Sequence, residues 1–294
     1  DARGIFGETP NMIGYFSELI GVEYPWDKYN QIVVRDYVSG AMENTTAVIH
    51  GDFVQQTKRE MIDGSAGEDV IAHELFHHWF GDLVTCESWA NLPLNESFAT
   101  YGEVLWREYK YGDDKAAEGL HNDLNTYLNE VKDGNHKEMI RFGYADKEDM
   151  FDRHSYQKGG RILHMLRIYM GDDAFFAALK YYLEENQYTD VEMHQFRMAC
   201  EKITGEDLNW FFNQWFYSKG HPVLDITYTY NDSLKMQVVD VVQQQDFSVA
   251  PVFKLPVKID FYVGGKVVTK EVTIDQVDNS FAFPFDSKPD LINF

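Results

Sequence analysis

Residues 70–80 of the chain read Val-Ile-Ala-His-Glu-Leu-Phe-His-His-Trp-Phe and contain the pattern His-Glu-x-x-His on a predicted helix. Residues four apart on a helix lie on the same face, so the imidazoles of His73 and His77 can reach one point. Glu74 lies one step round the helix, close enough to take a proton from a water on a metal ion. His78 lies about 140° from His73 at 3.6 residues per turn, so it is not expected to bind the same ion. The pattern predicts a metal site suited to hydrolysis, since zinc lowers the pKa of water to about 7.

A third ligand is expected, because catalytic zinc has three protein ligands and one open position. The next predicted helix carries Glu96, and two antiparallel helices joined by a short link can bring this carboxylate to the imidazoles. Read separately, the histidines could be two hydrogen-bonded core residues, and Glu96 an ordinary exposed acid. The combination favours one zinc ion (Zn2+) bound by His73, His77 and Glu96. Glu74 is then the catalytic base.

Composition restricts the class of partner. The chain has 294 residues and a formal net charge of −22, from 26 Lys and Arg against 48 Asp and Glu, which argues against a nucleic-acid partner. We interpret this charge as a solvated acidic surface that aids solubility; the alternative is a field that attracts a metal ion or a protonated amine. No stretch approaches 18 consecutive apolar residues, so no transmembrane segment is predicted.

Cysteine usage gives little further direction. The two cysteines, Cys86 and Cys200, make neither a disulfide framework nor a cysteine-based zinc site. The chain begins with Asp1 and has no signal-peptide pattern, which suggests processing or a piece of a longer protein. Compartment and oligomeric state stay open.

The period of the apolar pattern changes once along the chain. Before Gly220 it predicts extended segments at 31–37 and 41–53 and helices at 9–20, 67–84, 89–111, 113–131, 151–170, 173–186, 190–203 and 206–217. After Pro222, apolar and polar residues alternate, with turn signals at Asn231-Asp232 and Gly264-Gly265. We therefore predict an α+β protein, with a mainly helical domain at 1–221 and a small all-β sandwich at 222–294.

At this point the sequence resembles the M1, or gluzincin, zinc aminopeptidases. Their zinc signature is His-Glu-x-x-His, then 18 residues, then Glu, and the predicted ligands and base fall on it. Upstream, Gly40-Ala41-Met42-Glu43-Asn44 matches their Gly-x-Met-Glu-Asn motif. The resemblance implies that this segment binds substrate through its backbone and that Glu43 binds the free α-amino group, a charge-assisted contact.

A third match is Ser155-Tyr156-Gln157-Lys158-Gly159-Gly160, which is similar to the family's Tyr-x-Lys-Gly segment. The resemblance implies that Tyr156 donates a hydrogen bond to the oxyanion of the tetrahedral intermediate, although a core tyrosine with a bonded hydroxyl is the simpler alternative. The implied fold is thermolysin-like: a small mixed sheet over a helical lobe, with zinc between them and a β-sandwich following.

The sequence departs from the family at a few positions. Asp82 stands where Asn is usual, Pro93 replaces a common Trp, and Ser97 replaces the Gly that follows the zinc Glu; we expect local packing effects only. The resemblance also implies that a long N-terminal β-rich domain is missing, so the chain is expected to be a catalytic fragment.

The leading hypothesis is a zinc-dependent aminopeptidase that acts on peptides with a free N-terminus. The alternatives are an inactive or weakly active fragment or binding module that keeps the fold, an epoxide hydrolase with peptidase activity, and a thermolysin-type endopeptidase. The Gly40–Asn44 segment argues against the endopeptidase.

Overall fold

The computed structural model describes residues 2–294, apart from the side chain at position 63. Residue 1, the start of the predicted domain 1–221, lies outside the described residues. The chain forms two compact units, one of residues up to 135 together with 139–208, and the other of 136–138 together with 209–294. We call them the helical unit and the β unit. The predicted boundary at 221/222 stays a prediction.

The helical unit contains most of the helices and two small sheets. Its α-helices are α1 (Ala2–Ile5), α2 (Thr9–Ile20), α3 (Glu68–Phe76), α4 (Pro93–Tyr111), α5 (Asp113–Val131), α6 (Gly159–Met170), α7 (Asp172–Asn186) and α8 (Met193–Thr204). Short helices are η1 (Asp52–Val54), η2 (Glu60–Asp63), η3 (Trp89–Asn91), η4 (Lys147–Met150) and the π-helix η5 (His154–Lys158). Its strands are β1 (Asn30–Val34), β2 (Ala41–Met42), β3 (Ala47–Gly51), β4 (Val84–Cys86) and β5 (Thr189–Val191).

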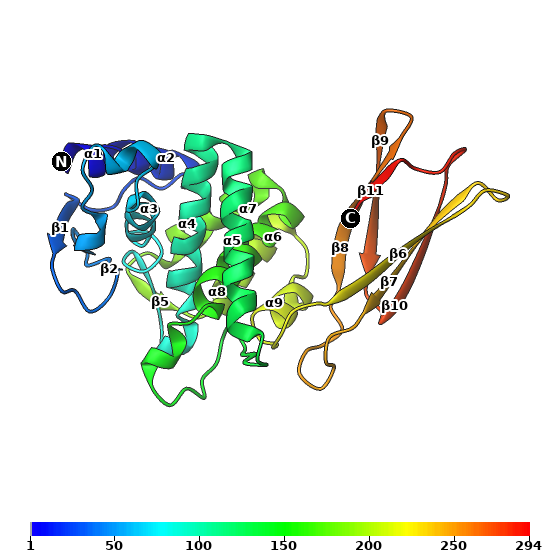
Figure 1. Cartoon of the computed structure of the whole chain (residues 1–294). Helices are drawn as coiled ribbons and strands as arrows, with labels where there is room; N and C mark the ends of the chain where they lie inside the picture. The colour runs from blue at the N-terminus through cyan, green and yellow to red at the C-terminus, as the bar shows by residue number, and fades with distance from the viewer. Residues whose placement is uncertain (1) are drawn as a thin grey trace. The chain divides into compact units, whose positions relative to one another are not determined.

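Helix α4 is the centre of this unit, and it contacts α3, α5, α6 and η5 (Figure 1). Gly102 allows the close approach of α3, because a Cβ at this position would lie 2.7 Å from the ring of Phe76. Fully buried aromatic rings also pack together in this unit. The ring of Phe80 stacks on that of Phe98 with centroids 4.5 Å apart, and Phe196 meets Phe98 edge-on. This packing holds the two helices that carry the predicted zinc ligands.

The first sheet has the order β1-β3-β2, with β1 parallel and β2 antiparallel to β3. The sequence predicts one long extended segment at 41–53, but the chain turns between β2 and β3, where the N–H of Ala47 donates to the carbonyl of Asn44. Thr46 in this turn has φ +65°. Strand β2 is therefore only two residues long and lies at the edge of the sheet.

The helix predicted at 67–84 is wrong beyond Phe76. His77 still has helical φ and ψ, and its N–H bonds to the carbonyl of His73, so the spacing argument for the histidine pair holds. The chain then turns, and Gly81 has φ +144°, which a side-chain-bearing residue rarely adopts. Strand β4 follows and pairs in parallel with β5, and neither strand was predicted.

The β unit contains α9 (Asn209–Trp215) and two three-stranded sheets. The orders are β10-β7-β6 and β11-β8-β9, formed by β6 (Leu224–Asn231), β7 (Met236–Gln243), β8 (Leu255–Val263), β9 (Lys266–Ile274), β10 (Asp278–Pro284) and β11 (Leu291–Asn293). Side chains of both sheets form one core around Val239, Val241, Ile259, Phe261 and Ile274. The predicted hairpin at Gly264-Gly265 is confirmed, since both glycines have positive φ and link β8 to β9.

Within residues 2–294, none of the helices has the length and apolar character needed to cross a membrane. Cys86 and Cys200 are both unbridged and both lie in the helical unit. The fold is mixed helix and sheet, as predicted.

Candidate active site

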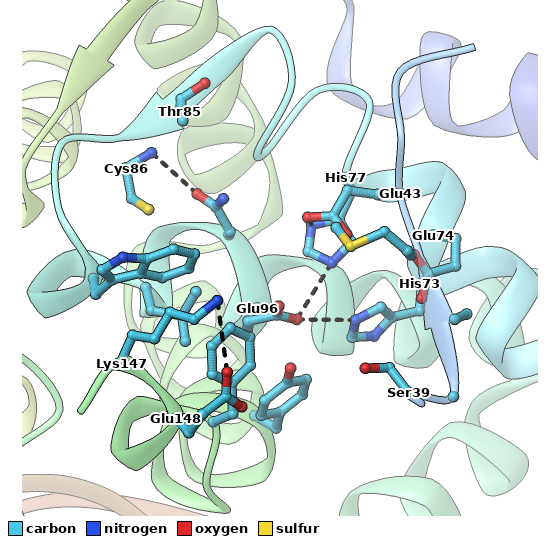
Figure 2. A pocket seen from close by; sticks show the side chains of 18 of the residues that line it. Ser39, Glu43, His73, Glu74, His77, Thr85, Cys86, Glu96, Lys147 and Glu148 are labelled. Atoms are coloured by element: carbon cyan, nitrogen blue, oxygen red, sulfur yellow. Dashed lines mark hydrogen bonds and ion pairs between the residues drawn. The ribbon is translucent and has the colours of Figure 1, made fainter. Parts of the chain in front are cut away.

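Three side chains from two helices meet at the predicted metal position. Nε2 of His73 lies 3.1 Å from Oε2 of Glu96, and Nε2 of His77 lies 3.3 Å from the same oxygen (Figure 2). The histidines come from α3 and its first following residue, and Glu96 comes from the first turn of α4. All three are buried, and their nearest donor atoms lie within 4.8 Å of one another.

The outer ring nitrogens of the two histidines have different partners. Nδ1 of His73 lies 2.9 Å from Oε1 of Glu103, and Nδ1 of His77 lies 3.1 Å from the carbonyl oxygen of Phe80. With Nδ1 as the donor in each contact, the lone pair of Nε2 is left to bind a metal ion. The carboxylate of Glu103 is in turn 3.4 Å from Arg107, which pairs with Asp69 at 2.7 Å.

This donor set fits zinc. Two imidazole nitrogens and one carboxylate oxygen are ligands that zinc accepts, and bonds of 2.0–2.1 Å at tetrahedral angles place neighbouring ligand atoms about 3.3 Å apart. The separations of 3.1 and 3.3 Å match this spacing. The outer-nitrogen contacts also hold both rings in the required orientation.

Glu74 lies beside this group without joining it. Its atom Oε2 is buried and has no hydrogen-bond partner among the described residues. Burial raises the pKa of Glu74 to about 7, while positive charge on His73 and His77 acts in the opposite direction. Such a carboxylate is well placed to exchange a proton near neutral pH.

The segment Gly40–Asn44 borders the same site. Its first four residues line the cleft, and Oε1 of Glu43 lies 4.0 Å from Nδ1 of His77. Among the described residues, strand β2 pairs with β3 alone, so its other edge makes no strand pairing. Asn44 does not line the cleft; its carbonyl closes the turn to β3. A substrate-binding role for Asn44 stays a prediction.

Tyr156 approaches from the π-helix η5. Its ring lies nearly parallel to that of His73, with centroids 6.0 Å apart. Burial raises the pKa of the Tyr156 hydroxyl, and the nearby carboxylate of Glu96 raises it further. The hydroxyl therefore stays protonated at neutral pH and can act as a hydrogen-bond donor.

One cleft of about 1240 Å3 is lined by His73, His77, Glu96, Glu74, Glu43 and Tyr156. Its walls also include residues that the sequence analysis missed, from β4 and the segment after it and from η4 and its surroundings: Thr85, Cys86, Glu87, Ser88, Trp89, Leu92, Lys147, Glu148, Phe151 and Arg153. Trp89 and Phe151 are 41% and 38% exposed and contact each other with ring centroids 5.8 Å apart. Trp89 and Phe151 thus give the cleft an aromatic wall, in addition to the polar side chains of the predicted site.

Comparison with known proteins agrees with the geometry. The sequence model of the peptidase family M1 domain matches residues 6–215. The chain belongs to peptidase family M1. It is 33% identical over 237 residues to aminopeptidase N of Streptomyces lividans and 31% identical over 220 residues to aminopeptidase M1 of Arabidopsis thaliana. These alignments cover 76% and 71% of this M1 chain, but only 27% and 24% of the two relatives.

The fold of this M1 chain also matches a solved structure. Aminopeptidase A of Legionella pneumophila, in complex with aspartic acid, superimposes with a TM-score of 0.77 over 96% of this chain and 32% of that one. The sequences are 22% identical, so this likeness concerns the fold alone.

The departures from the family pattern have identifiable surroundings in this M1 chain. Pro93 occupies the first turn of α4, where its missing N–H costs no hydrogen bond. Asp82 lies 3.8 Å from His78, and burial raises its pKa to about 7. Ser97 does more than fill space, because its hydroxyl donates to the carbonyl of Ser155 at 2.7 Å.

Glu103 is the site residue that sequence reasoning could have found. It lies seven residues after Glu96 on α4, which is two helical turns and therefore the same face. The aromatic wall had no such signal, because Trp89 and Phe151 come from segments far apart in the chain.

Proposed function

We propose that this chain is the catalytic part of a zinc-dependent aminopeptidase, which hydrolyses the first peptide bond of peptides with a free N-terminus. The observation that carries the proposal is the convergence of His73, His77 and Glu96 in a cleft that Glu74, Glu43 and Tyr156 also line. Family membership and the aminopeptidase names of the relatives support the same activity.

His73, His77 and Glu96 would hold one zinc ion, which supplies a Lewis acid that polarises the scissile carbonyl and makes water more acidic. Glu74 takes a proton from the attacking water at its unpartnered oxygen and passes it to the leaving amine nitrogen. The hydroxyl of Tyr156 donates a hydrogen bond to the carbonyl oxygen as negative charge develops there.

Glu43 gives the reaction its preference for chain ends. Its side chain is 16% exposed at the cleft, so a substrate ammonium group can meet a partly desolvated carboxylate. The backbone of Gly40–Met42 at the edge of the sheet can pair with the extended substrate. An acetylated N-terminus loses the charge and adds bulk, and such a peptide should be refused.

The test is the zinc content of the purified chain together with turnover of leucyl or alanyl anilide and of the N-acetylated anilide. One zinc per chain and turnover of the free-amine substrate alone is the expected result. Equal turnover of the acetylated substrate would favour an endopeptidase, and turnover of an epoxide instead would favour an epoxide hydrolase. Zinc without turnover of any substrate would favour a binding module, and absence of zinc would remove the mechanism.

A further inference from the structure

The segment that carries Tyr156 is a π-helix, an arrangement rare in proteins and common at functional sites. The N–H of Lys158 bonds to the carbonyl of Arg153, and that of Gly159 to the carbonyl of His154, each five residues back. A single π turn is less stable than α-helix, so its shape depends on contacts from the rest of the fold. Three such contacts surround it.

Asp152 fixes the entry to η5. Its Oδ1 accepts hydrogen bonds from the backbone N–H groups of His154 and Ser155, both at 3.1 Å. Its Oδ2 pairs with Arg141 at 2.6 Å, and both side chains are 11% exposed. Arg141 also donates to the carbonyl of Asp149. The carboxylate thus works as a helix cap that is itself held in place.

Glu130 of α5 supports the same turn from another side. Its Oε2 accepts the N–H of Arg153 at 3.1 Å, and its Oε1 lies 3.0 Å from Nδ1 of the buried His154. Glu130, Asp152 and His154 lie close enough to hold a metal ion, but the pairing of Asp152 with Arg141 supplies the positive charge there. Glu130 and Asp152 therefore stabilise the start of η5.

The third contact comes from the helix that carries Glu96. The hydroxyl of Ser97, the next residue, donates to the carbonyl of Ser155 at 2.7 Å in a fully buried place. Gly159 makes room for it, since a Cβ at 159 would lie 1.8 Å from Oγ of Ser97. One hydrogen bond therefore joins the neighbour of Glu96 to the neighbour of Tyr156.

We propose that Ser97 is a positioning residue, whose hydrogen bond to Ser155 fixes the Tyr156 hydroxyl relative to the carboxylate of Glu96. This inference rests on the proposed function, in which Tyr156 donates to the developing oxyanion. Asp152 and Glu130 fix the start of the π turn, and Ser97 fixes its distance from α4. A displacement of a catalytic group by about 1 Å can cost 100-fold in rate, so one well-placed bond can matter.

The test is a double-mutant cycle between Ser97→Ala and Tyr156→Phe. In the parent chain, Ser97→Ala should lower kcat about tenfold, with KM and zinc affinity within about twofold. In the Tyr156→Phe background, the same substitution should change kcat by less than about twofold, because the hydroxyl to be positioned is gone. Equal losses in the two backgrounds would overturn the proposal, as would a Tyr156→Phe variant as active as the parent.

A second readout does not depend on turnover. Binding of a phosphinic peptide with a free amine, which imitates the tetrahedral species, should weaken about tenfold on Ser97→Ala in the parent and remain unchanged in Tyr156→Phe. If this coupling is seen while no variant hydrolyses anilides, the proposed function fails and the positioning role stands. Absence of coupling in binding would count against the positioning role itself.

Two further variants separate the hydrogen bond from packing. The double variant Ser97→Gly with Gly159→Ala removes the serine side chain and places a methyl group at 159 in the space that it leaves. It does not restore the hydroxyl that donates to the carbonyl of Ser155. The kcat should stay low, and full recovery would show that volume alone matters. Ser17→Ala is the matched control, because the Ser17 hydroxyl also donates to a backbone carbonyl, that of Ile13 at 2.7 Å, but on α2. It should leave kcat unchanged.

Discussion

The helical unit and the β unit fill their interiors in different ways. The helical unit buries ionisable side chains, among them His73, Glu74, His77 and Glu96, next to its aromatic core. Residues 222–294, all of them described, bury no ionisable side chain, and their buried polar groups are the glutamines Gln237, Gln243 and Gln245. Each glutamine amide is hydrogen-bonded, for example Gln243 to the carbonyl of Phe253.

This difference indicates different roles for the two units. A buried charge costs free energy unless it is paired, so a fold keeps such groups where they have a use. The β unit gains stability from an apolar core, and none of the side chains that form this core can take part in acid–base chemistry. Substitutions in the two units should therefore fail in different ways.

The largest expected effect is that of Glu74→Gln. Loss of the base should lower kcat at least 1,000-fold, since the amide cannot accept the proton, while zinc content stays at one per chain. Anilide turnover and metal analysis measure the two quantities. Glu87→Gln, a change of the same kind on the cleft wall, is the control and should keep most of the activity. Activity that survives Glu74→Gln would show that the mechanism is wrong.

Phe261→Ala should affect the β unit alone. The ring is fully buried and contacts Phe283 and Phe285 with centroids 5.2 and 5.0 Å away, so its removal should cost about 3–5 kcal/mol of unfolding free energy. Urea unfolding measures the loss, and Val267→Ala on an exposed site of β9 is the control. A fall in zinc affinity on Phe261→Ala would contradict the prediction that this substitution affects the β unit alone.

Glu103→Gln tests the support of the metal group. Glutamine keeps the shape but removes the charge that faces Nδ1 of His73, and we expect zinc affinity to fall about 10–100-fold. Competition with a chelator measures the affinity. Glu148→Gln, in the same cleft but 3.6 Å from Lys147, should change it little. If both variants lower zinc affinity equally, the cause is the total negative charge of the cleft and not the contact between Glu103 and His73.

The smallest effect is expected from Gly102→Ala. The added Cβ meets the Phe76 ring, and the forced separation of α3 and α4 should cost about 1–3 kcal/mol of unfolding free energy. Gly14→Ala, in the interior of α2 with nothing within 4 Å of the new Cβ, should instead stabilise the chain by about 0.5–1 kcal/mol. Thermal unfolding compares the two, and stabilisation by both would contradict the packing argument.

The parts of the site that depend on local geometry could be predicted from the sequence. The His73–His77 pair follows from helical spacing, and the alternation after Pro222 indicates the strands of the β unit. Family resemblance added Glu43 and Tyr156, which the structure places at the same cleft.

The rest depends on contacts between distant segments. The apolar run through Trp79 and Phe80 gives no signal that α3 ends at Phe76, because these rings are buried after the turn as well. The π-helix could not be foreseen either, since its supports come from Ser97 and Glu130, far from Tyr156 in the chain.

The location of the two cysteines allows the units to be followed separately in solution. Burial raises the pKa of the Cys86 thiol to about 12 and also raises that of Cys200, so little thiolate is present at neutral pH. Cys86 lines the cleft and is partly exposed, whereas Cys200 is fully buried, so alkylation of Cys200 requires opening of the helical unit. The β unit contributes no signal because it has no cysteine. The rate of Cys200 labelling with and without added zinc then measures how strongly the metal protects the helical unit against opening.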